Sequence, residues 1–415
     1  MALAKRLFYP NMTSKYADRS IIKALHEGFI TDDDVSIIQR YIRERTHEKN
    51  MSEGRQLKNL YTLVHWRRFI PAPYLQATYD NILTGIEELK RGKNAKGEPF
   101  KQNTLHDYIR ILKPFLLWMI ENNLSSIPEK KVSKISAPPV DYQTTSPDEI
   151  LTKDDVLALI GAAKDHRDQA LLAVLYESGA RIGELARLRW RDIGYDDKPG
   201  AKLYISDTKT NKQRYSRLTW SVDYLHIWRQ NYPGEAKGDN PVFLTYSDKP
   251  LEYATVQAML RRLCDRAEKK LGWKRKHVHP HLFRKSRITH MISENYQEST
   301  VKESMWGNVA TGMFRTYVKL SENNIDAEFL EKAGLAVGND IKEEPIRPRT
   351  CGVCHKVNEA AARYCSGCGT PLTKEAAARI TELKNELEQE QLKPEYRAIM
   401  DEFKMKLIQL QREKG

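Results

Sequence analysis

Cysteine is scarce in this chain of 415 residues: there are five, and four of them form two C-x2-C pairs. So few cysteines exclude a small secreted fold held by disulfides, and the pairing is typical of metal ligation in a reducing compartment. No apolar run approaches the roughly 20 residues that a membrane-spanning helix needs. The opening "MALAKRLFYP" also lacks an apolar segment of signal-peptide length. We therefore expect a soluble, cytoplasmic protein without a membrane partner.

Acidic residues are fewer than basic ones, 55 against 68, which leaves a formal net charge of +13. A basic chain of this kind favours an anionic partner, either nucleic acid or an anionic membrane surface, and net charge alone does not choose between them. Forty per cent of the residues are hydrophobic, and the length suffices for two or three domains with ordinary packed cores.

Residues 1–135 are predicted to be mostly helical, because apolar residues recur near the 3.6-residue period in several stretches. Basic side chains are interleaved with these stretches, and such side chains suit contacts to DNA phosphates. A solvated surface is the alternative for any one of them. The candidate DNA-binding residues are Arg67, Arg68, Lys101 and Arg110.

A proline-bearing stretch without a sustained period predicts a linker over residues 136–149. Structure is expected to resume at Thr152, which can cap a helix whose first turn carries Asp154 and Asp155. Residues 150–335 combine helices with two short strands around a polar turn in "AKLYISDTKTNKQRYSRLTW". A second linker, residues 336–350, separates this region from the cysteine pairs in 351–371 and from a helical tail, 372–415.

Four separated clusters carry residues suited to phosphodiester chemistry. Arg181 follows a Ser-Gly turn at the start of a helix, and Lys209 lies at the tip of the predicted hairpin. His281 and Arg284 are three residues apart, which places them on one face of a helix. The fourth cluster, "SMWGNVATGMFRTYVKL", contains the last two candidates, Asn308 and Tyr317.

These residue types form a set that can cleave a phosphodiester without a metal ion. Two arginines can clamp the non-bridging oxygens and stabilise the charge of the transition state. A lysine can protonate the departing oxygen, and a histidine can accept the proton of a tyrosine, whose phenol has an unperturbed pKa of about 10. A tyrosine that attacks phosphorus conserves the bond energy, so that the strand can be resealed without ATP.

The order and spacing of these motifs resemble the tyrosine recombinase, or integrase, family over about residues 55–320. The motifs are "ARIGEL", "TKTNKQR", "HLFR", and "WGN" followed by a tyrosine nine residues after Asn308. The resemblance to phage-type and archaeal-type integrases implies a mainly α fold with a small β-sheet. It would comprise a helical core-binding domain in residues 1–135 and a mixed α+β catalytic domain in residues 150–335.

The same resemblance implies a role for each candidate. Arg181 and Arg284 would bind the scissile phosphate, Lys209 would be the general acid and His281 the proton acceptor. Tyr317 would be the nucleophile that forms a 3′-phosphotyrosine bond with double-stranded DNA. Asn308 departs from the family, which commonly has histidine or tryptophan there, but its amide can still donate a hydrogen bond.

The segment after Tyr317, "SENNIDAEFLEKAGL", resembles a helix that docks on a neighbouring protomer and thereby links cleavage to a tetramer on two DNA sites. A helix packed on its own domain is the alternative. Two other functions remain open: a type IB topoisomerase that relaxes supercoils, and a DNA-binding protein with a degenerate site.

Each candidate also has a structural interpretation. Arg181 could simply pair with Glu184 one turn later, an interaction worth little at a surface. Lys212 is a rival to Lys209 in the same turn. His277 and His279 are interpreted as structural or DNA-facing, since no carboxylate or cysteine nearby completes a metal site. Tyr317 could be an ordinary core aromatic residue.

The sequence "CGVCHKVNEAAARYCSGCG" predicts a structural zinc site and resembles a small zinc ribbon. Four thiolates suit a tetrahedral zinc ion, and iron is the less favoured alternative. A protein or DNA contact and a purely structural role are both open for this module. The predicted ligands are Cys351, Cys354, Cys365 and Cys368.

Overall fold

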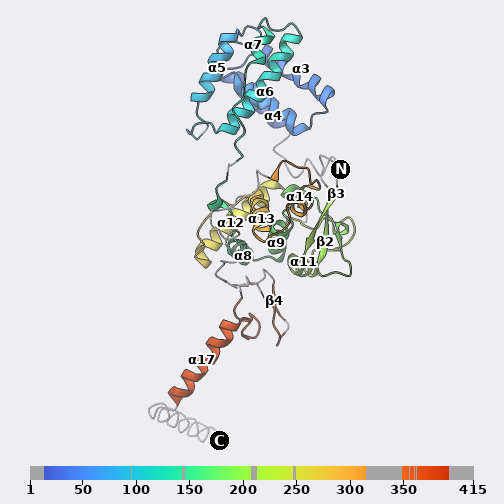
Figure 1. Cartoon of the computed structure of the whole chain (residues 1–415), viewed down its shortest axis with the longest axis vertical. Coiled ribbons are helices and arrows are strands. Elements are labelled where there is room, and N and C mark those ends of the chain that lie inside the picture. Colours follow the sequence, from blue (N-terminus) through green and yellow to red (C-terminus); the bar gives the residue numbers. More distant parts are fainter. Residues whose placement is uncertain are drawn as a thin grey trace, which may run out of the picture. The chain divides into compact units, whose positions relative to one another are not determined.

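The computed structural model describes most of the chain. The described residues are 14–94, 96–142, 145–206, 213–245, 249–314, 348–354, 356–358, 360 and 362–391. By its contacts the chain divides into two compact units (Figure 1), one built mainly from residues 1–146 and one mainly from 147–243, 257–311 and 319–415. Short segments, 244–256 and 312–318, are grouped with the first unit. Within the described residues, none of the helices is both long enough and apolar enough to cross a membrane.

The first unit is helical, as its apolar periodicity predicts. Its core is built around α4 and α6: α4 packs against α2, α3 and α6, and α6 also packs against α5 and α7. Trp66, Leu63 and Phe115 are completely buried in this core. The helices are α2 (Ser14–His26), α3 (Asp32–Lys49), α4 (Glu53–Trp66), α5 (Tyr79–Arg91), α6 (Gln102–Glu121) and α7 (Glu129–Ser133).

The second unit combines helices with a small antiparallel sheet in the order β1-β2-β3. Its strands are β1 (Ile193–Gly194), β2 (Ala201–Ser206) and β3 (Gln213–Leu218). Its helices and 3-10 turns are η1 (Pro147–Glu149), α8 (Lys153–Ala162), α9 (His166–Ser178), α10 (Ile182–Leu185), η2 (Trp190–Asp192), α11 (Ser221–Gln230), α12 (Tyr253–Leu271), α13 (Pro280–Ser293) and α14 (Glu298–Trp306). The predicted hairpin strands and the Thr152 cap are confirmed: Asp155 N–H donates to Thr152 Oγ1 at 3.1 Å.

Helix α9 is the centre of the second unit. Every residue from Arg167 to Ser178 is buried, and the helix packs against α8, α11, α13 and β3. Its one acidic residue near the C-terminal end, Glu177, accepts hydrogen bonds from the main-chain N–H groups and hydroxyls of Thr219 and Ser221, at 2.6 to 2.9 Å. The carboxylate therefore satisfies the unpaired N–H groups at the start of α11.

C-terminal to these helices, a two-stranded antiparallel sheet joins β4 (Arg349–Thr350) to β5 (Val357–Asn358). Helix α17 (Lys374–Gln391) follows and represents the part of the predicted helical tail that the structure describes. The overall composition, mainly helical with small sheets, agrees with the fold class that the sequence predicts.

Candidate active site and metal centre

Arg284 lies where two helix ends meet. Its Nη1 donates to the Gly179 carbonyl at 2.6 Å, and its Nη2 donates to the Met305 carbonyl at 2.7 Å. The side chain is 0% exposed, and the centre of its guanidinium lies 5.0 Å from the centroid of the Trp306 ring. Carbonyls at helix C-termini lack intrahelical donors and carry partial negative charge. A guanidinium donates hydrogen bonds to these carbonyls and brings a positive charge that complements theirs. In this structure Arg284 therefore joins the ends of α9 and α14 and is closed to solvent.

Two glycines make this junction possible. Gly179 ends α9 and Gly307 ends α14, both in the left-handed region, at φ values of 55° and 62°. A Cβ atom at Gly179 would lie 2.6 Å from the Met305 sulfur, and one at Gly307 would lie 3.3 Å from Arg214 Cβ. Both positions combine an unfavourable φ for other residues with close neighbours. Because positions 179 and 307 are both glycine, the end of α9 can approach Arg284 and the end of α14 can approach Arg214.

Arg181 is the N-cap residue of α10, two residues after Gly179, and thus lies at the start of a helix as predicted. Its Nη1 donates to Glu184 Oε1 at 2.9 Å, and its main-chain N–H donates to Glu184 Oε2 at 2.7 Å. The pairing with Glu184 thus exists, although the Arg181 side chain stays 42% exposed while that of Glu184 is 5% exposed. The exposed guanidinium is held in place by a buried carboxylate, which is an arrangement suited to presenting positive charge at the surface.

His281 lies on α13, one turn before Arg284, as the i, i+3 spacing predicts. Although the residue remains exposed overall, desolvation by neighbouring protein atoms is the main cause that lowers its pKa to about 4, and the positive charges of Arg284, Lys285 and Arg181 act in the same direction. The imidazole is therefore neutral at neutral pH and has a nitrogen lone pair with which to accept a proton. His279, at the N-cap of α13, also has a lowered pKa, mainly through desolvation.

Asn308 follows Gly307 at the surface in a tight turn. Its Oδ1 accepts the Ala310 N–H at 3.0 Å, and its main-chain carbonyl accepts the Thr311 N–H at 3.3 Å. Because the oxygen is used inside the turn, the amide NH2 is the end of the side chain that remains to donate. The role of Asn308 as a donor to a phosphate oxygen stays a sequence-based prediction.

Arg181, His281, Arg284 and Asn308 are gathered around the ends of α9 and α14. Arg284 donates to the carbonyl of Gly179, two residues before Arg181, and to the carbonyl of Met305, three residues before Asn308. The positive charges of Arg181 and Arg284 both lower the pKa of His281. Lys209, its rival Lys212 and Tyr317 lie outside the described residues, as does the segment proposed to dock on a neighbour. The general acid and the nucleophile therefore remain sequence-based predictions.

Sequence reasoning missed the importance of Glu184 and Arg214. Arg214 is 3% exposed, and its Nη2 donates to Glu184 Oε2 at 2.7 Å. One signal was available: in the strand "QRYSRL" the inward positions alternate, and Arg214 shares the inward face with Ser216 and Leu218. A basic residue at an inward strand position indicates a buried charged partner.

Of the predicted DNA-binding residues, Arg67 is not at the surface. Its side chain is 7% exposed, its Nε donates to Asp34 Oδ2 at 2.7 Å, and its Nη1 donates to the Ile70 carbonyl. A buried ion pair of this kind holds α3 against the end of α4, so this structure offers Arg67 no contact with DNA. The predicted contacts Lys101 and Arg110 are exposed.

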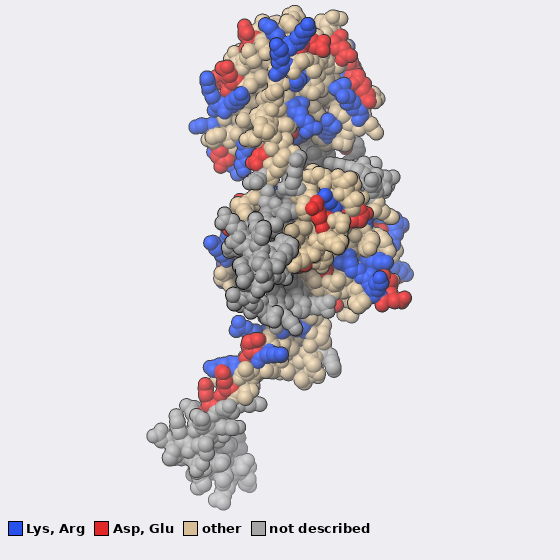
Figure 2. Space-filling view, viewed as in Figure 1, with Lys and Arg blue, Asp and Glu red and all other residues tan. Residues whose placement is uncertain are grey.

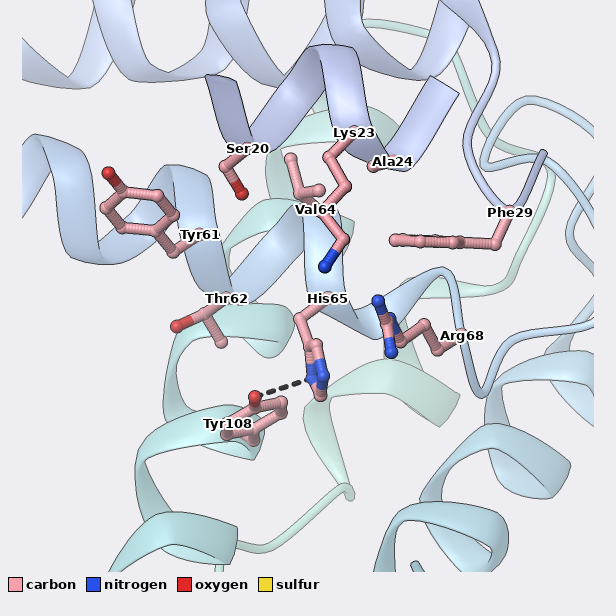
Figure 3. Close-up of a pocket in the computed structure, with 10 residues that line it drawn as sticks. All are labelled: Ser20, Lys23, Ala24, Phe29, Tyr61, Thr62, Val64, His65, Arg68 and Tyr108. Carbon is pink, nitrogen blue, oxygen red and sulfur yellow. Dashed lines mark hydrogen bonds between the residues drawn. The ribbon is translucent and has the colours of Figure 1, made fainter. Parts of the chain in front are cut away.

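Arg68 borders a cavity of about 230 Å³ between α2 and α4 (Figure 3), which Lys23 also lines. Its guanidinium lies 4.3 Å from the centroid of the Phe29 ring and pairs with Glu27 at 2.9 Å. Nearby, His65 and Tyr108 share a 2.7 Å hydrogen bond, and burial raises the pKa of Tyr108 to about 12 while lowering that of His65. The two rings are therefore neutral, and Arg68 and Lys23 supply the positive charge.

Charges of both signs are mixed on the face of the first unit that Figure 2 shows. Basic side chains alternate there with acidic ones, in agreement with ion pairs such as Lys58 with Asp107 at 2.6 Å and Arg40 with Glu44 at 2.9 Å. This face therefore does not present a continuous basic patch, and DNA contacts by Arg68, Lys101 and Arg110 stay sequence-based predictions.

The four paired cysteines converge in space, as their spacing predicts. Their sulfur atoms all lie within 4.8 Å of one another, with 3.5 Å between Cys351 and Cys368 and between Cys354 and Cys365. The Val353 and Gly367 N–H groups point to the sulfurs of Cys351 and Cys365, at 3.4 and 3.3 Å. Four thiolates at these separations, each pair on a tight turn, fit a single tetrahedral metal ion, and zinc suits an all-thiolate set.

The fold is similar to that of solved integrases. Two solved structures share it: lambda integrase bound to DNA (TM-score 0.52, 16% identity, covering 68% of this chain and 95% of that one) and the Tn1549 transposon integrase in complex with a circular intermediate DNA (TM-score 0.52, 18% identity, covering 71% and 99%). Residues 149–324 match the phage integrase family. The second unit thus carries a domain of the phage integrase type.

Curated relatives point to the same class. Tyrosine recombinase XerC of Xanthomonas axonopodis pv. citri (strain 306) is 26% identical over 238 residues, which is 56% of this chain and 70% of the relative. XerC of Shewanella oneidensis is 31% identical over 141 residues, which is 33% of this chain and 42% of that protein. The matches to further XerC proteins span about half of their length. The zinc-ribbon resemblance has no counterpart in the family match, which ends before the cysteines.

Proposed function

We propose that the chain is a site-specific DNA recombinase, or integrase, that cleaves and rejoins duplex DNA. The observation that carries this proposal is the convergence of Arg181, His281, Arg284 and Asn308 within the domain that matches the phage integrase family. The fold shared with DNA-bound integrases and the net charge of +13 support the same partner.

In the proposed reaction the Tyr317 hydroxyl oxygen attacks the scissile phosphorus, and the bond from phosphorus to the 5′ oxygen breaks. Neutral His281 takes the phenol proton, and Lys209 gives a proton to the departing 5′ oxygen. Arg181 neutralises charge on the non-bridging oxygens, and Asn308 donates a hydrogen bond to one of them. The resemblance implies that Arg284 also binds this phosphate; because Arg284 is enclosed in this structure, we propose instead that its fixed charge supports the site from within. The steps need neither ATP nor a metal ion, and their reversal reseals the strand.

A nicked duplex that loses its short 5′ fragment after cleavage tests the chemistry, because the covalent adduct then accumulates. We expect the full chain to form a slowly migrating protein–DNA adduct on a denaturing gel, with or without a chelator present. Tyr317→Phe should form none, while Tyr296→Phe, which alters an exposed tyrosine of the second unit, should behave like the wild type. An adduct in Tyr317→Phe, or none in the wild type, contradicts the proposal.

Plasmid relaxation and strand-exchange assays distinguish the alternative functions. A type IB topoisomerase would relax supercoiled plasmid without exchanging strands between two duplexes, and a degenerate DNA-binding protein would retain the duplex without any adduct. We propose strand exchange by a tetramer on two DNA sites; among the proteins with this fold, a lambda integrase tetramer bound to a Holliday junction supports this assembly. Mass photometry of the full chain with two-site DNA should detect four protomers, and a complex of one protomer per site would contradict it.

At the C-terminal end we propose a structural zinc ion held by Cys351, Cys354, Cys365 and Cys368. Zinc would supply the core that the two short strands β4 and β5 lack, because metal binding is the folding energy of such small modules. Release with a thiol-blocking reagent should yield one zinc per chain in a colorimetric assay, and Cys351→Ser should yield less than one. Hydrogen exchange of residues 349–358 should become fast in the same variant.

A further inference from the structure

A buried carboxylate connects two arginines of the second unit. Glu184 accepts three hydrogen bonds, two from Arg181 and one from Arg214 Nη2 at 2.7 Å. Arg181 is 42% exposed, whereas the Arg214 side chain is 3% exposed. The two arginines therefore differ in kind: Arg181 presents its charge at the surface, and Arg214 directs its charge to the interior.

Arg214 has a second bond that leads to the other side of the site. Its Nη1 donates to the Ser304 carbonyl at 2.9 Å, in the last turn of α14. Its Cβ also lies against Gly307, where a side chain would approach within 3.3 Å. Strand β3, which carries Arg214, packs against α14. One guanidinium thus links the carboxylate that holds Arg181 with the helix end that leads into Asn308.

We propose that Arg214 is a positioning residue that sets the placement of Arg181 and Asn308 at the scissile phosphate. This inference rests on the proposed function and adds a residue to it. Arg214 compensates part of the negative charge of Glu184, and the same carboxylate orients Arg181 through its own hydrogen bond. If Arg214 is removed, Arg181 is the remaining basic partner of the buried carboxylate among the described residues, and Arg181 is drawn toward Glu184 and away from the phosphate. The end of α14 loses its bond to β3 at the same time.

Arg214→Ala tests this inference, with Arg217→Ala as the matched control. Arg217 lies three residues further along the same strand, but its bonds go to exposed Asp196 and to the Pro199 carbonyl. We expect Arg214→Ala to slow adduct formation on nicked DNA by about 10²-fold, because an ångström-scale displacement of a positioned group costs about that much. Duplex affinity should change by less than about threefold, since a buried arginine contacts no phosphate.

A double-mutant cycle separates positioning from mere support of the fold. In an Arg181→Ala background, Arg214→Ala should slow the reaction by clearly less than about 10²-fold, because the part that acts through Arg181 is already lost and only the part that acts through Asn308 remains. A full loss of about 10²-fold in that background would show a general structural role and overturn the inference. Arg214→Lys provides a second variant in case alanine prevents folding: it keeps a charge beside Glu184 but has one nitrogen for two acceptors, and we expect an intermediate rate.

A measurement independent of cleavage distinguishes this inference from the proposed function. The Nε–H resonance of Arg181, assigned by comparison with Arg181→Lys, should shift in Arg214→Ala and stay in place in Arg217→Ala. An unchanged Arg181 resonance overturns the inference even if the wild type cleaves DNA. A shifted resonance supports the positioning of Arg181 even if the wild type forms no adduct, in which case the proposed function fails alone.

Discussion

Replacement of Arg284 with alanine separates a structural from a purely catalytic role for this residue. The enclosed guanidinium makes two hydrogen bonds to main-chain carbonyls, at 2.6 and 2.7 Å, from the ends of α9 and α14. Hydrogen bonds that involve a charged group contribute about 1.5–3 kcal/mol each. Alanine removes both and leaves a cavity beside Trp306. Allowing for relaxation and for overlap between the two bonds, we expect the free energy of unfolding to fall by about 3–5 kcal/mol.

Urea denaturation of the full chain measures this loss of stability. Hydrogen exchange of peptides from α9 and α14 then shows whether the loss is located at these two helices. Arg191→Ala is the control, because its partner Asp239 is exposed and such surface pairs contribute about 0–1 kcal/mol. Arg284→Lys should fall between the two, since one ammonium group replaces a two-pronged donor. If Arg284→Ala loses less than about 1 kcal/mol while adduct formation disappears, the guanidinium acts on DNA alone and the structural reasoning is refuted.

Three further predictions concern other parts of the chain. Gly179→Ala should destabilise the second unit by about 2–4 kcal/mol in a urea titration, because the new methyl group clashes with the Met305 sulfur and the backbone φ is unfavourable for alanine. Gly238 also has a φ of 55° but has open space around it, so Gly238→Ala should cost about 1 kcal/mol in the same titration. The proton resonances of His281 should titrate with a pKa near 4 in the free protein, and a pKa near 6.5 would contradict the proposed environment. Because the folded pKa lies below the unfolded value of about 6.5, the neutral ring contributes its full stability above pH 6.5, and this contribution decreases as the pH falls toward 4. Arg67→Ala should lower the free energy of unfolding of the first unit by about 3–5 kcal/mol in thermal denaturation, because the buried carboxylate of Asp34 loses this partner. Arg68→Ala removes a surface pair and should cost less than about 1 kcal/mol; equal effects of the two variants would contradict the difference in burial.

Local patterns were sufficient to predict many elements. Alternation in the hairpin strands, the Thr152 cap and the placement of His281 and Arg284 on one helix depend on residues within a few positions of each other. The mixture of a helical region and a mixed region likewise follows from periodicity. These features were accessible because a helix or strand repeats over short distances, whatever it packs against.

Tertiary context decided the rest. Arg67 and Arg68 are adjacent in sequence, but Asp34, 33 residues before Arg67, draws only Arg67 into the core. The spacing of His281 and Arg284 fixes their common face without showing that the end of α9 would enclose the arginine. Burial of this kind depends on contacts between residues about 100 positions apart, which no local pattern records.

The burial of α9 from Arg167 to Ser178 has a consequence for the order in which the chain can fold. Its partner α13 begins at Pro280, and the bond from Arg284 to Gly179 closes a loop of 105 residues. Until that later segment has been synthesised, the apolar surface of α9 has no cover on that side, and closing so long a loop is intrinsically slow. We therefore expect α9 to be protected late during synthesis on the ribosome, and chains that stop before α13 to depend on chaperones and to aggregate.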